Sequence, residues 1–221
     1  MNSEVLGVDV GLLTAAHELK SPLSLLRQLA LSLDLVQNPA QISSQMITIS
    51  ERALSQIDDL LKIARLENGL FELEPVNPRT ICDSLNADLN FAKQIRITYR
   101  NRRRLAIANR QLLHSIISNF ITNAIKYGDE AQLAIYDHAD TIRISVRDFG
   151  PALPISIWRT INTNSLESPL PTPLRPGSSG LGLFIASRFA RHMHATLGAI
   201  RHRDGTSFYL DLPLSRQLTL C

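Results

Sequence analysis

The amino-acid sequence predicts an α-helical hairpin followed by an α+β sandwich, in which a mixed sheet is covered by helices. Apolar residues recur every three or four positions over about 9–36 and 40–66, as in helices that pack against other helices. Beyond Gly69, short alternating strands mix with amphipathic helices without a regular βαβ order, which is typical of an α+β domain. We therefore expect residues 1–69 to form the hairpin and residues 70–221 to form the α+β domain.

The composition is that of an ordinary globular protein, and it excludes several classes. Hydrophobic residues make up 44% of the chain and charged residues 19%, and no apolar run reaches the roughly 20 residues that span a bilayer. Residues 1–10 lack the basic start and apolar core of a signal peptide. Cys82 and Cys221 form neither a disulfide framework nor a metal cluster, which favours a reducing compartment. Cys82 has apolar neighbours and is expected in the core.

In the hairpin, Pro22 bends the first helix because it removes one backbone hydrogen bond. Asn38-Pro39 is the expected turn, and Asn68-Gly69 ends the second helix. The second helix has its apolar seam at Ile42, Met46, Ile49, Ala53, Ile57, Leu60 and Ala64. A hairpin alone leaves such a seam uncovered, so we expect two copies to form a four-helix bundle. The alternative is that the hairpin packs on its own downstream domain.

In the α+β part, alternation and turn residues predict the elements in order. They are a strand at 71–74, a helix at about 78–92, strands at about 95–99 and 105–108, a helix at 110–127, antiparallel strands at 132–136 and 141–147, a helix at about 181–194, and a hairpin within 198–214. Asn109 is expected to cap the helix at 110–127. The buried face of that helix should comprise Leu112, Leu113, Ile116, Ile117, Phe120, Ile121 and Ala124. The proline-rich segment is too long for a simple connection and predicts a lid at about 151–179.

An arginine-rich segment gives the modest net charge of +3 an uneven distribution. Its members are Arg96, Arg100, Arg102, Arg103 and Arg104. The segment has one tyrosine and no repeated basic–aromatic pattern, so a solvated turn is the first interpretation. A surface for a protein partner is the second, and we predict no nucleic-acid partner.

Two asparagines, Asn119 and Asn123, share one face of the helix at 110–127, and Lys126 and Tyr127 follow at its end. Asparagine is mildly unfavourable inside a helix, so two on one face require a reason. A carboxamide oxygen suits a Mg²⁺ ion that already carries phosphates, and Lys126 offers a positive charge to phosphate oxygens. The alternative is that both asparagines only hold neighbouring loops.

Two glycine-containing loops complete a candidate nucleotide site. Asp148 ends a strand and can accept a hydrogen bond from an exocyclic amine such as that of adenine, while Gly150 lets the backbone pass close to a flat ring. Residues 177–183 lead into a helix start, whose free N–H groups and dipole favour an anion. This loop has neither the Walker sequence nor the strand context of a dinucleotide-binding loop.

Near the start of the chain, His17 and Glu18 lie side by side on the first predicted helix. Such a pair alone is usually a solvated surface, but the nucleotide site downstream gives His17 a group to react with. The stretch Ala16-His17-Glu18-Leu19-Lys20-Ser21-Pro22-Leu23 resembles the H box of sensor histidine kinases. Residues 118–127 resemble their N box, Asp148-Phe149-Gly150 their first glycine box, residues 177–183 their second, and Leu66-Glu67-Asn68-Gly69 the end of their dimerisation hairpin.

The resemblance implies a dimerisation and phosphotransfer hairpin followed by a Bergerat-type ATP-binding domain. It implies that His17 attacks the γ-phosphate of Mg²⁺-ATP, assisted by Glu18, and that the phosphoryl group then passes to an aspartate in the receiver domain of a response regulator. Asn123 is the implied Mg²⁺ ligand. The implied nucleotide contacts are Asn119, Asn123, Lys126, Tyr127, Asp148, Gly150, Gly180, Leu181 and Gly182.

The chain departs from the family pattern in three places. Ala152 replaces the second glycine of the first glycine box, Ile157-Trp158 is the only candidate for the family's aromatic box, and Ser21 stands where kinases with phosphatase activity usually have Thr or Asn. The departures keep a second function open, that of a degenerate kinase acting as a dimeric scaffold or phosphatase for a response regulator. A related ATPase or serine kinase is a third.

Since the chain starts close to His17, we expect a cytoplasmic core whose membrane anchor, if any, belongs to a sensor region absent from this chain.

Overall fold

A computed structural model of the protein describes residue 20 and residues 22–32, 39–88, 95–101, 104–163, 166 and 181–215. Residues 22–32 are helical. The elements that follow are α2 (Pro39–Glu67), β1 (Glu74–Val76), α3 (Pro78–Asp88), β2 (Ile95–Arg100), β3 (Ala106–Ala108), α4 (Arg110–Gly128), β4 (Ala131–His138), β5 (Thr141–Arg147), α5 (Ile155–Asn162), α6 (Leu181–His192), β6 (Thr196–His202) and β7 (Gly205–Pro213). Among the described residues, no helix combines the length and the apolar character needed to cross a membrane.

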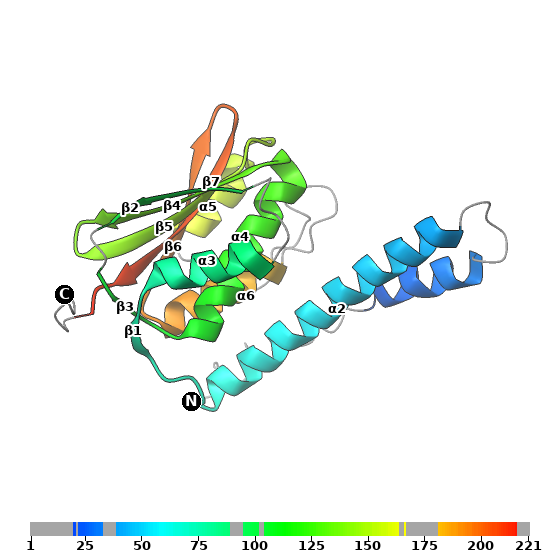
Figure 1. Ribbon diagram of the computed structural model, residues 1–221, viewed down its shortest axis with the longest axis horizontal. Coiled ribbons are helices and arrows are strands. Elements are labelled where there is room, and N and C mark those ends of the chain that lie inside the picture. Colours follow the sequence, from blue (N-terminus) through cyan, green and yellow to red (C-terminus); the bar gives the residue numbers. More distant parts are fainter. Residues whose placement is uncertain are drawn as a thin grey trace.

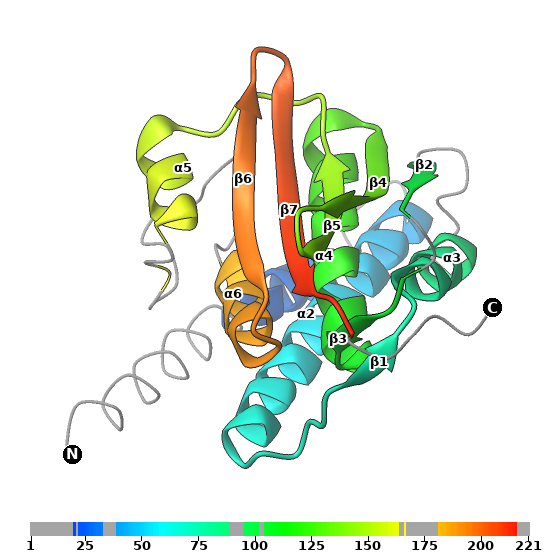
Figure 2. The same cartoon turned by 90° about the vertical axis from the view of Figure 1, so that its left-hand side faces the viewer.

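The main sheet has five strands in the order β2-β4-β5-β7-β6. β2 runs parallel to β4, and the other neighbours are antiparallel, so the sheet is mixed, as predicted. Helices α3, α4 and α6 cover one face of this sheet (Figure 1, Figure 2). The core lies between the two layers, where Phe120 of α4 stacks on Phe208 of β7 with 5.6 Å between ring centroids. The predicted α+β architecture is confirmed.

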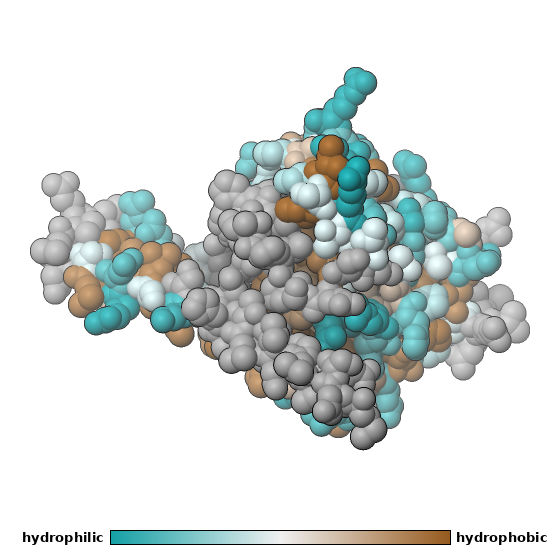
Figure 3. Space-filling model, turned by 180° about the vertical axis from the view of Figure 1, so that it is seen from behind, coloured by the Kyte–Doolittle hydropathy of each residue, from teal (hydrophilic) through white to brown (hydrophobic). Residues whose placement is uncertain are grey.

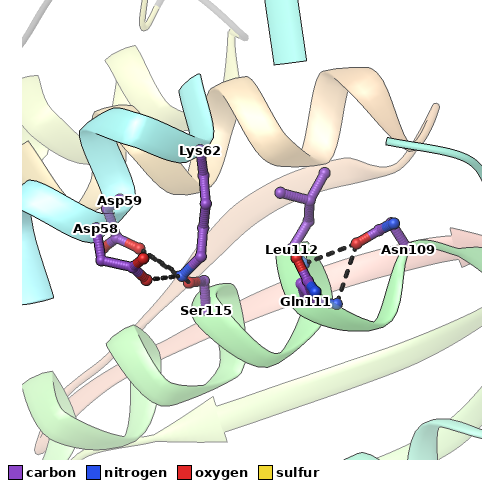
Figure 4. A network of polar contacts seen from close by, with 7 residues as sticks. All are labelled: Asp58, Asp59, Lys62, Asn109, Gln111, Leu112 and Ser115. Atoms are coloured by element: carbon purple, nitrogen blue, oxygen red, sulfur yellow. Dashed lines mark hydrogen bonds and ion pairs between the residues drawn. The ribbon is translucent and has the colours of Figure 1, made fainter. Parts of the chain in front are cut away.

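Helix α4 has the local structure that its sequence predicts. The side-chain oxygen of Asn109 accepts hydrogen bonds from the backbone N–H groups of Gln111 (3.0 Å) and Leu112 (3.2 Å), which caps the helix (Figure 4). Seven apolar side chains are buried, and they are the predicted ones: Leu112, Leu113, Ile116, Ile117, Phe120, Ile121 and Ala124. The opposite face is therefore left for polar side chains.

The first strand lies later than the sequence predicts. β1 begins at Glu74 and includes Pro75, whereas the alternation at 71–74 favoured a strand that ended before the proline. Phe71 is buried in the core without belonging to a strand. Because β1 pairs only with β3, in a separate two-stranded sheet, the N–H that proline lacks is not needed on the open side.

The segment predicted to be a lid begins with a helix that is anchored on the sheet. Trp158 of α5 donates a hydrogen bond from Nε1 to the carbonyl of Ala199 on β6 (2.8 Å). The Asn162 side chain donates to the same carbonyl (3.0 Å) and accepts from the Ala199 N–H (3.1 Å). Residues 164–165 and 167–179 of the predicted lid lie outside the described residues.

Helix α2 belongs to the α+β domain at one end and extends away from it at the other (Figure 1). Near its C-terminus, Ile63 is buried in the domain core, with Leu60 and Leu66 packed against that core. Ile47, Leu54 and Leu61 are spaced seven apart and are exposed. Apolar side chains also gather on the projecting part of the molecule (Figure 3). This stripe is long enough to accept another helix.

We expect Asn109→Ala to lower the free energy of unfolding by about 1 kcal/mol, because two N–H groups at the start of α4 lose their acceptor. Chemical denaturation measures this change. Asn109→Ser is the matched control: it keeps a side-chain oxygen at the cap and, like alanine, lacks the hydrogen bond from Asn109 Nδ2 to the Glu72 carbonyl, so its loss should be clearly smaller. Equal losses in both variants would show that the cap contributes nothing.

Candidate functional site

Asn119 and Asn123 lie one turn apart on the polar side of α4. Asn123 donates a hydrogen bond from Nδ2 to Oδ1 of Asn119 at 2.6 Å, and both side chains are half-buried. The bond fixes the amide of Asn119 and turns the Asn123 carbonyl oxygen away from its neighbour. A neutral oxygen in this position can act as a hard-metal ligand.

The start of α6 lies directly against Asn119. A Cβ atom at residue 182 would overlap the side-chain amide of Asn119, so Gly182 permits this close approach. Leu181 is fully buried in the core, and therefore only its backbone can face a ligand. The two helices α4 and α6 thus bring the first asparagine and the second glycine loop together, as the sequence predicted.

Asp148 follows β5 and is held by backbone groups on both sides. Its carboxylate is 1% exposed, and Oδ1 accepts hydrogen bonds from the N–H groups of Gly150 (3.1 Å) and Thr206 (3.0 Å). The Asp148 N–H donates in turn to the Thr206 carbonyl at 2.9 Å. These bonds offset the cost of burying a carboxylate and leave its orientation fixed.

The end of α4 packs against the loop that contains Asp148. A Cβ at residue 150 would overlap the carbonyl of Tyr127, and one at residue 128 would approach the Phe149 N–H to 2.5 Å. Lys126 is exposed, with Nζ 5.1 Å from the centroid of the Tyr127 ring. The structure therefore brings together Lys126, Tyr127, Asp148 and Gly150, four of the predicted residues.

Three residues of this region were not predicted from the sequence: Thr206, Gly128 and Leu153. Thr206 binds Asp148, and its hydroxyl accepts from the Leu153 N–H at 3.3 Å. Gly128 allows the contact between α4 and the loop. The Leu153 carbonyl also accepts from Arg201 Nε at 2.7 Å, so the segment just after Ala152 is tied at both backbone groups. The role of Thr206 depends on the pairing of β5 with β7, which the sequence does not specify. Gly128 could have been predicted, because a glycine directly after Tyr127 indicates a close backbone contact at the end of the helix.

Four predicted residues cannot be placed. His17, Glu18, Ser21 and Gly180 lie outside the described residues. Within the part of the chain that the structure describes, no group of three or more His, Cys, Asp and Glu side chains could hold a metal ion. Burial raises the pKa of the Cys82 thiol to about 12, so this cysteine is a core residue and not a nucleophile, as expected.

The arginine-rich segment is exposed at Arg96 and Arg100 and half-buried at Arg104. Arg96 lies 3.2 Å from Glu130, and their side chains are 72% and 49% exposed. Such an exposed pair stabilises the fold little. Arg100 is exposed as well, and Arg102 and Arg103 lie outside the described residues.

Along α4, the two halves of the candidate site are about 12 Å apart, since eight residues separate Asn119 from Tyr127. Asn119 and Asn123 with the start of α6 suit phosphates and a metal ion, because amide oxygens and the N–H groups of a helix start meet there. The close contact between the start of α6 and the Asn119 amide is possible only because residue 182 has no side chain. The residues present therefore fit Mg²⁺ with phosphates at one end and a base near Asp148 at the other.

Comparison with known proteins agrees with this arrangement. Residues 108–216 match the family of histidine kinase-, DNA gyrase B- and HSP90-like ATPases. The sensor histidine kinase MtrB of Mycolicibacterium paratuberculosis is 28% identical over 216 residues, which cover 91% of this chain and 38% of MtrB. The chain thus spans about two fifths of the length of this curated relative.

Two solved structures share the fold. The histidine kinase AdeS of Acinetobacter baumannii has a TM-score of 0.68 at 14% identity, over 90% of this chain and 98% of AdeS. Histidine kinase ThkA, solved in complex with the response regulator protein TrrA, has a TM-score of 0.65 at 18% identity, over 96% of this chain and 64% of ThkA. At these identities the likeness shows the fold.

We expect Gly182→Ala to weaken the binding of a non-hydrolysable, Mg²⁺-bound ATP analogue by roughly tenfold, because the new methyl group displaces the Asn119 amide. Isothermal calorimetry measures the affinity. Gly198→Ala is the control, since a Cβ there also displaces a side chain, the ring of Tyr209, but away from α4. If both substitutions weaken binding equally, Gly182 has no specific part in the site.

Proposed function

Because residues 108–216 form a histidine kinase-, DNA gyrase B- and HSP90-like ATPase domain, and the chain is related over 91% of its length to sensor histidine kinases, we propose that it is the kinase core of a two-component system. It transfers the γ-phosphoryl group of ATP to His17 and then to an aspartate of a response regulator. The observation that carries this proposal is the convergence of both halves of the site on one helix, α4.

The predicted nucleotide-binding residues have separate proposed tasks. Asp148 accepts a hydrogen bond from the exocyclic amine of adenine through Oδ2, since its Oδ1 is bound by Gly150 and Thr206. Lys126 and Tyr127 contact the nucleotide from the end of α4. The backbone of Gly180, Leu181 and Gly182 lines the triphosphate, together with Asn119. Asn123 would hold Mg²⁺ through its amide oxygen, and the ion would supply positive charge to the phosphates.

The proposed transfer begins with the neutral imidazole of His17. A ring nitrogen forms a bond to the γ-phosphorus while the bond to the bridging oxygen of ADP breaks, and Glu18 orients the imidazole and takes up its proton. The phosphoryl group then passes from His17 to a carboxylate oxygen of the regulator's aspartate. Ser21, four residues after His17, can orient a water that attacks the phosphoaspartate of the regulator and releases inorganic phosphate.

The hairpin and its dimer belong to the same proposal. Residues 1–69 form the dimerisation and phosphotransfer hairpin, and residues 70–221 form the ATP-binding domain with its lid at about 151–179. Ile47, Leu54 and Leu61 support a homodimer, because an exposed apolar stripe of heptad spacing is stabilised when a second hairpin covers it. A sensor region outside this chain would supply any membrane anchor and leave this part in the cytoplasm.

One observation favours the alternative of a scaffold without kinase activity. The segment after Ala152 is tied through both backbone groups of Leu153, which restrains a lid that needs to open. A degenerate kinase would bind the regulator, as ThkA binds TrrA in the solved complex, without binding nucleotide. Calorimetry with the ATP analogue separates the two: measurable affinity supports the kinase, and its absence supports the scaffold.

We expect incubation with γ-labelled ATP and Mg²⁺ to give an acid-labile, base-stable label on the protein, because a phosphoryl group on imidazole hydrolyses in acid. His17→Gln should abolish the label while leaving the affinity for the ATP analogue unchanged. A label that survives this substitution would falsify the assignment of His17. Loss of both label and affinity would point to a folding defect, which circular dichroism detects.

A further inference from the structure

A half-buried polar cluster joins α2 to α4. Lys62 donates hydrogen bonds from Nζ to Asp59 Oδ1 (3.3 Å) and to Ser115 Oγ (2.8 Å), and the Ser115 hydroxyl donates to Asp59 Oδ1 (2.9 Å). The three groups close a ring of contacts across the two helices (Figure 4). The Lys62 and Asp59 side chains are only 16% and 17% exposed. Asp58 also contacts Lys62, at 2.6 Å, but stays within α2 and is 62% exposed.

The cluster is poorly suited to chemistry. A serine beside a lysine can form a nucleophile and its base, but here Lys62 donates its hydrogen bond to Ser115, and the Ser115 hydroxyl donates to Asp59. An ammonium ion cannot accept the proton of the Ser115 hydroxyl. Burial also raises the pKa of the Asp59 carboxyl, against the opposing influence of Lys62 and Ser115. These groups therefore serve to hold two helices together.

The surrounding interface is only partly filled. Ile63 is buried in the core of the α+β domain, one residue from Lys62. Next to it, Lys62 lines a cleft of about 420 Å³ between α2, α3 and α4, whose other walls include Thr80, Ile81 and His114. An interface that borders a cleft has fewer apolar contacts than a fully packed interface, so fewer apolar contacts are lost when its two sides separate. Each polar contact between α2 and α4 therefore contributes a larger share of the stability of this interface.

Ser115 lies on the helix that carries the candidate nucleotide site. Ser115, Asn119 and Asn123 follow one another at intervals of four residues, so they occupy one face of α4. Ser115 is bound to Asp59 and Lys62 of α2, and Asn119, one turn further along, contacts Gly182. Any force on α2 at Lys62 therefore acts on the helix that would hold ATP.

The proposed function requires the ATP-binding domain to occupy more than one position. Phosphoryl transfer needs the reacting atoms within roughly 3.5 Å of each other, so the domain must reach the histidine. The same histidine must afterwards be open to a regulator's aspartate, which the domain would block. A contact that holds the domain against α2 thus sets how often each position is occupied.

We propose that Asp59, Lys62 and Ser115 form a latch that holds the ATP-binding domain in its docked position on α2, and that opening the latch releases the domain. The inference rests on the proposed function, because it assigns the latch to the step between autophosphorylation and transfer. Movement of α2 opens it by separating Lys62 and Asp59 from Ser115.

Pulsed electron–electron spin resonance on the full chain tests the latch directly. Spin labels are attached at Ser43→Cys on the projecting part of α2 and at Asp140→Cys on the β4–β5 turn, which are both exposed. Cys221→Ser removes the terminal thiol, and Cys82 is buried. Dilution with unlabelled protein leaves one labelled subunit per dimer. In the unmodified latch, we expect one dominant distance, that of the docked domain.

Ser115→Ala and Lys62→Met should each raise the ratio of released to docked domain by at least about fivefold, because each removes hydrogen bonding that joins α2 to α4. The double variant should add little to either single change, since the groups act as one cluster. Asp58→Asn is the matched control and should leave the ratio unchanged, because Asp58 contacts Lys62 within α2. An unchanged distance distribution in both Ser115→Ala and Lys62→Met overturns the latch, as does an equal shift in Asp58→Asn.

The outcome is separable from that of the proposed function. The distance measurement needs no kinase activity, whereas labelling of His17 and affinity for the ATP analogue report the function alone. A fivefold release in the latch variants with no label on His17 overturns the kinase assignment and leaves the domain contact established. A labelled His17 with unchanged distances overturns the latch and leaves the kinase assignment intact.

Discussion

The close approach between the end of α4 and the loop after β5 organises the functional half of the molecule. It depends on Gly128 and Gly150, where any side chain would overlap the neighbouring backbone. The contact places Tyr127 beside Asp148, whose carboxylate is in turn oriented by the N–H groups of Gly150 and Thr206. Three elements distant in sequence thus meet at one point, and the base-binding end of the proposed site follows from packing of the backbone.

Helix α4 connects the stability of the domain to its proposed chemistry. One face supplies seven buried side chains to the core, which fixes the height and rotation of the helix above the sheet. The other face then has a fixed position for Asn119 and Asn123, opposite Gly182 of α6. The same face begins at Ser115, in contact with α2. A rigid helix with three such connections can transmit a change at α2 to the phosphate end of the site.

The sequence predicts well those features that depend on residues close together in the chain. The cap at Asn109 and the buried face of α4 follow from local spacing, and both are confirmed. The partners of Asp148 depend on which strands pair, so Thr206 was not predicted. The bounds of β1 were predicted wrongly because of Pro75: a proline ends most strands, but it is tolerated in a two-stranded sheet. The contact of Lys62 with Ser115 joins residues 53 positions apart, which no local pattern reveals.

The claim that α4 holds ATP between Asp148 and Gly182 is tested most directly by a structure of the chain with Mg²⁺ and a non-hydrolysable ATP analogue. We expect the adenine amine within hydrogen-bond distance of the Asp148 carboxylate, the metal ion on the Asn123 oxygen, and the phosphates between Asn119 and the start of α6. A nucleotide bound elsewhere, or a site that stays empty at saturating analogue, would contradict the proposed kinase function.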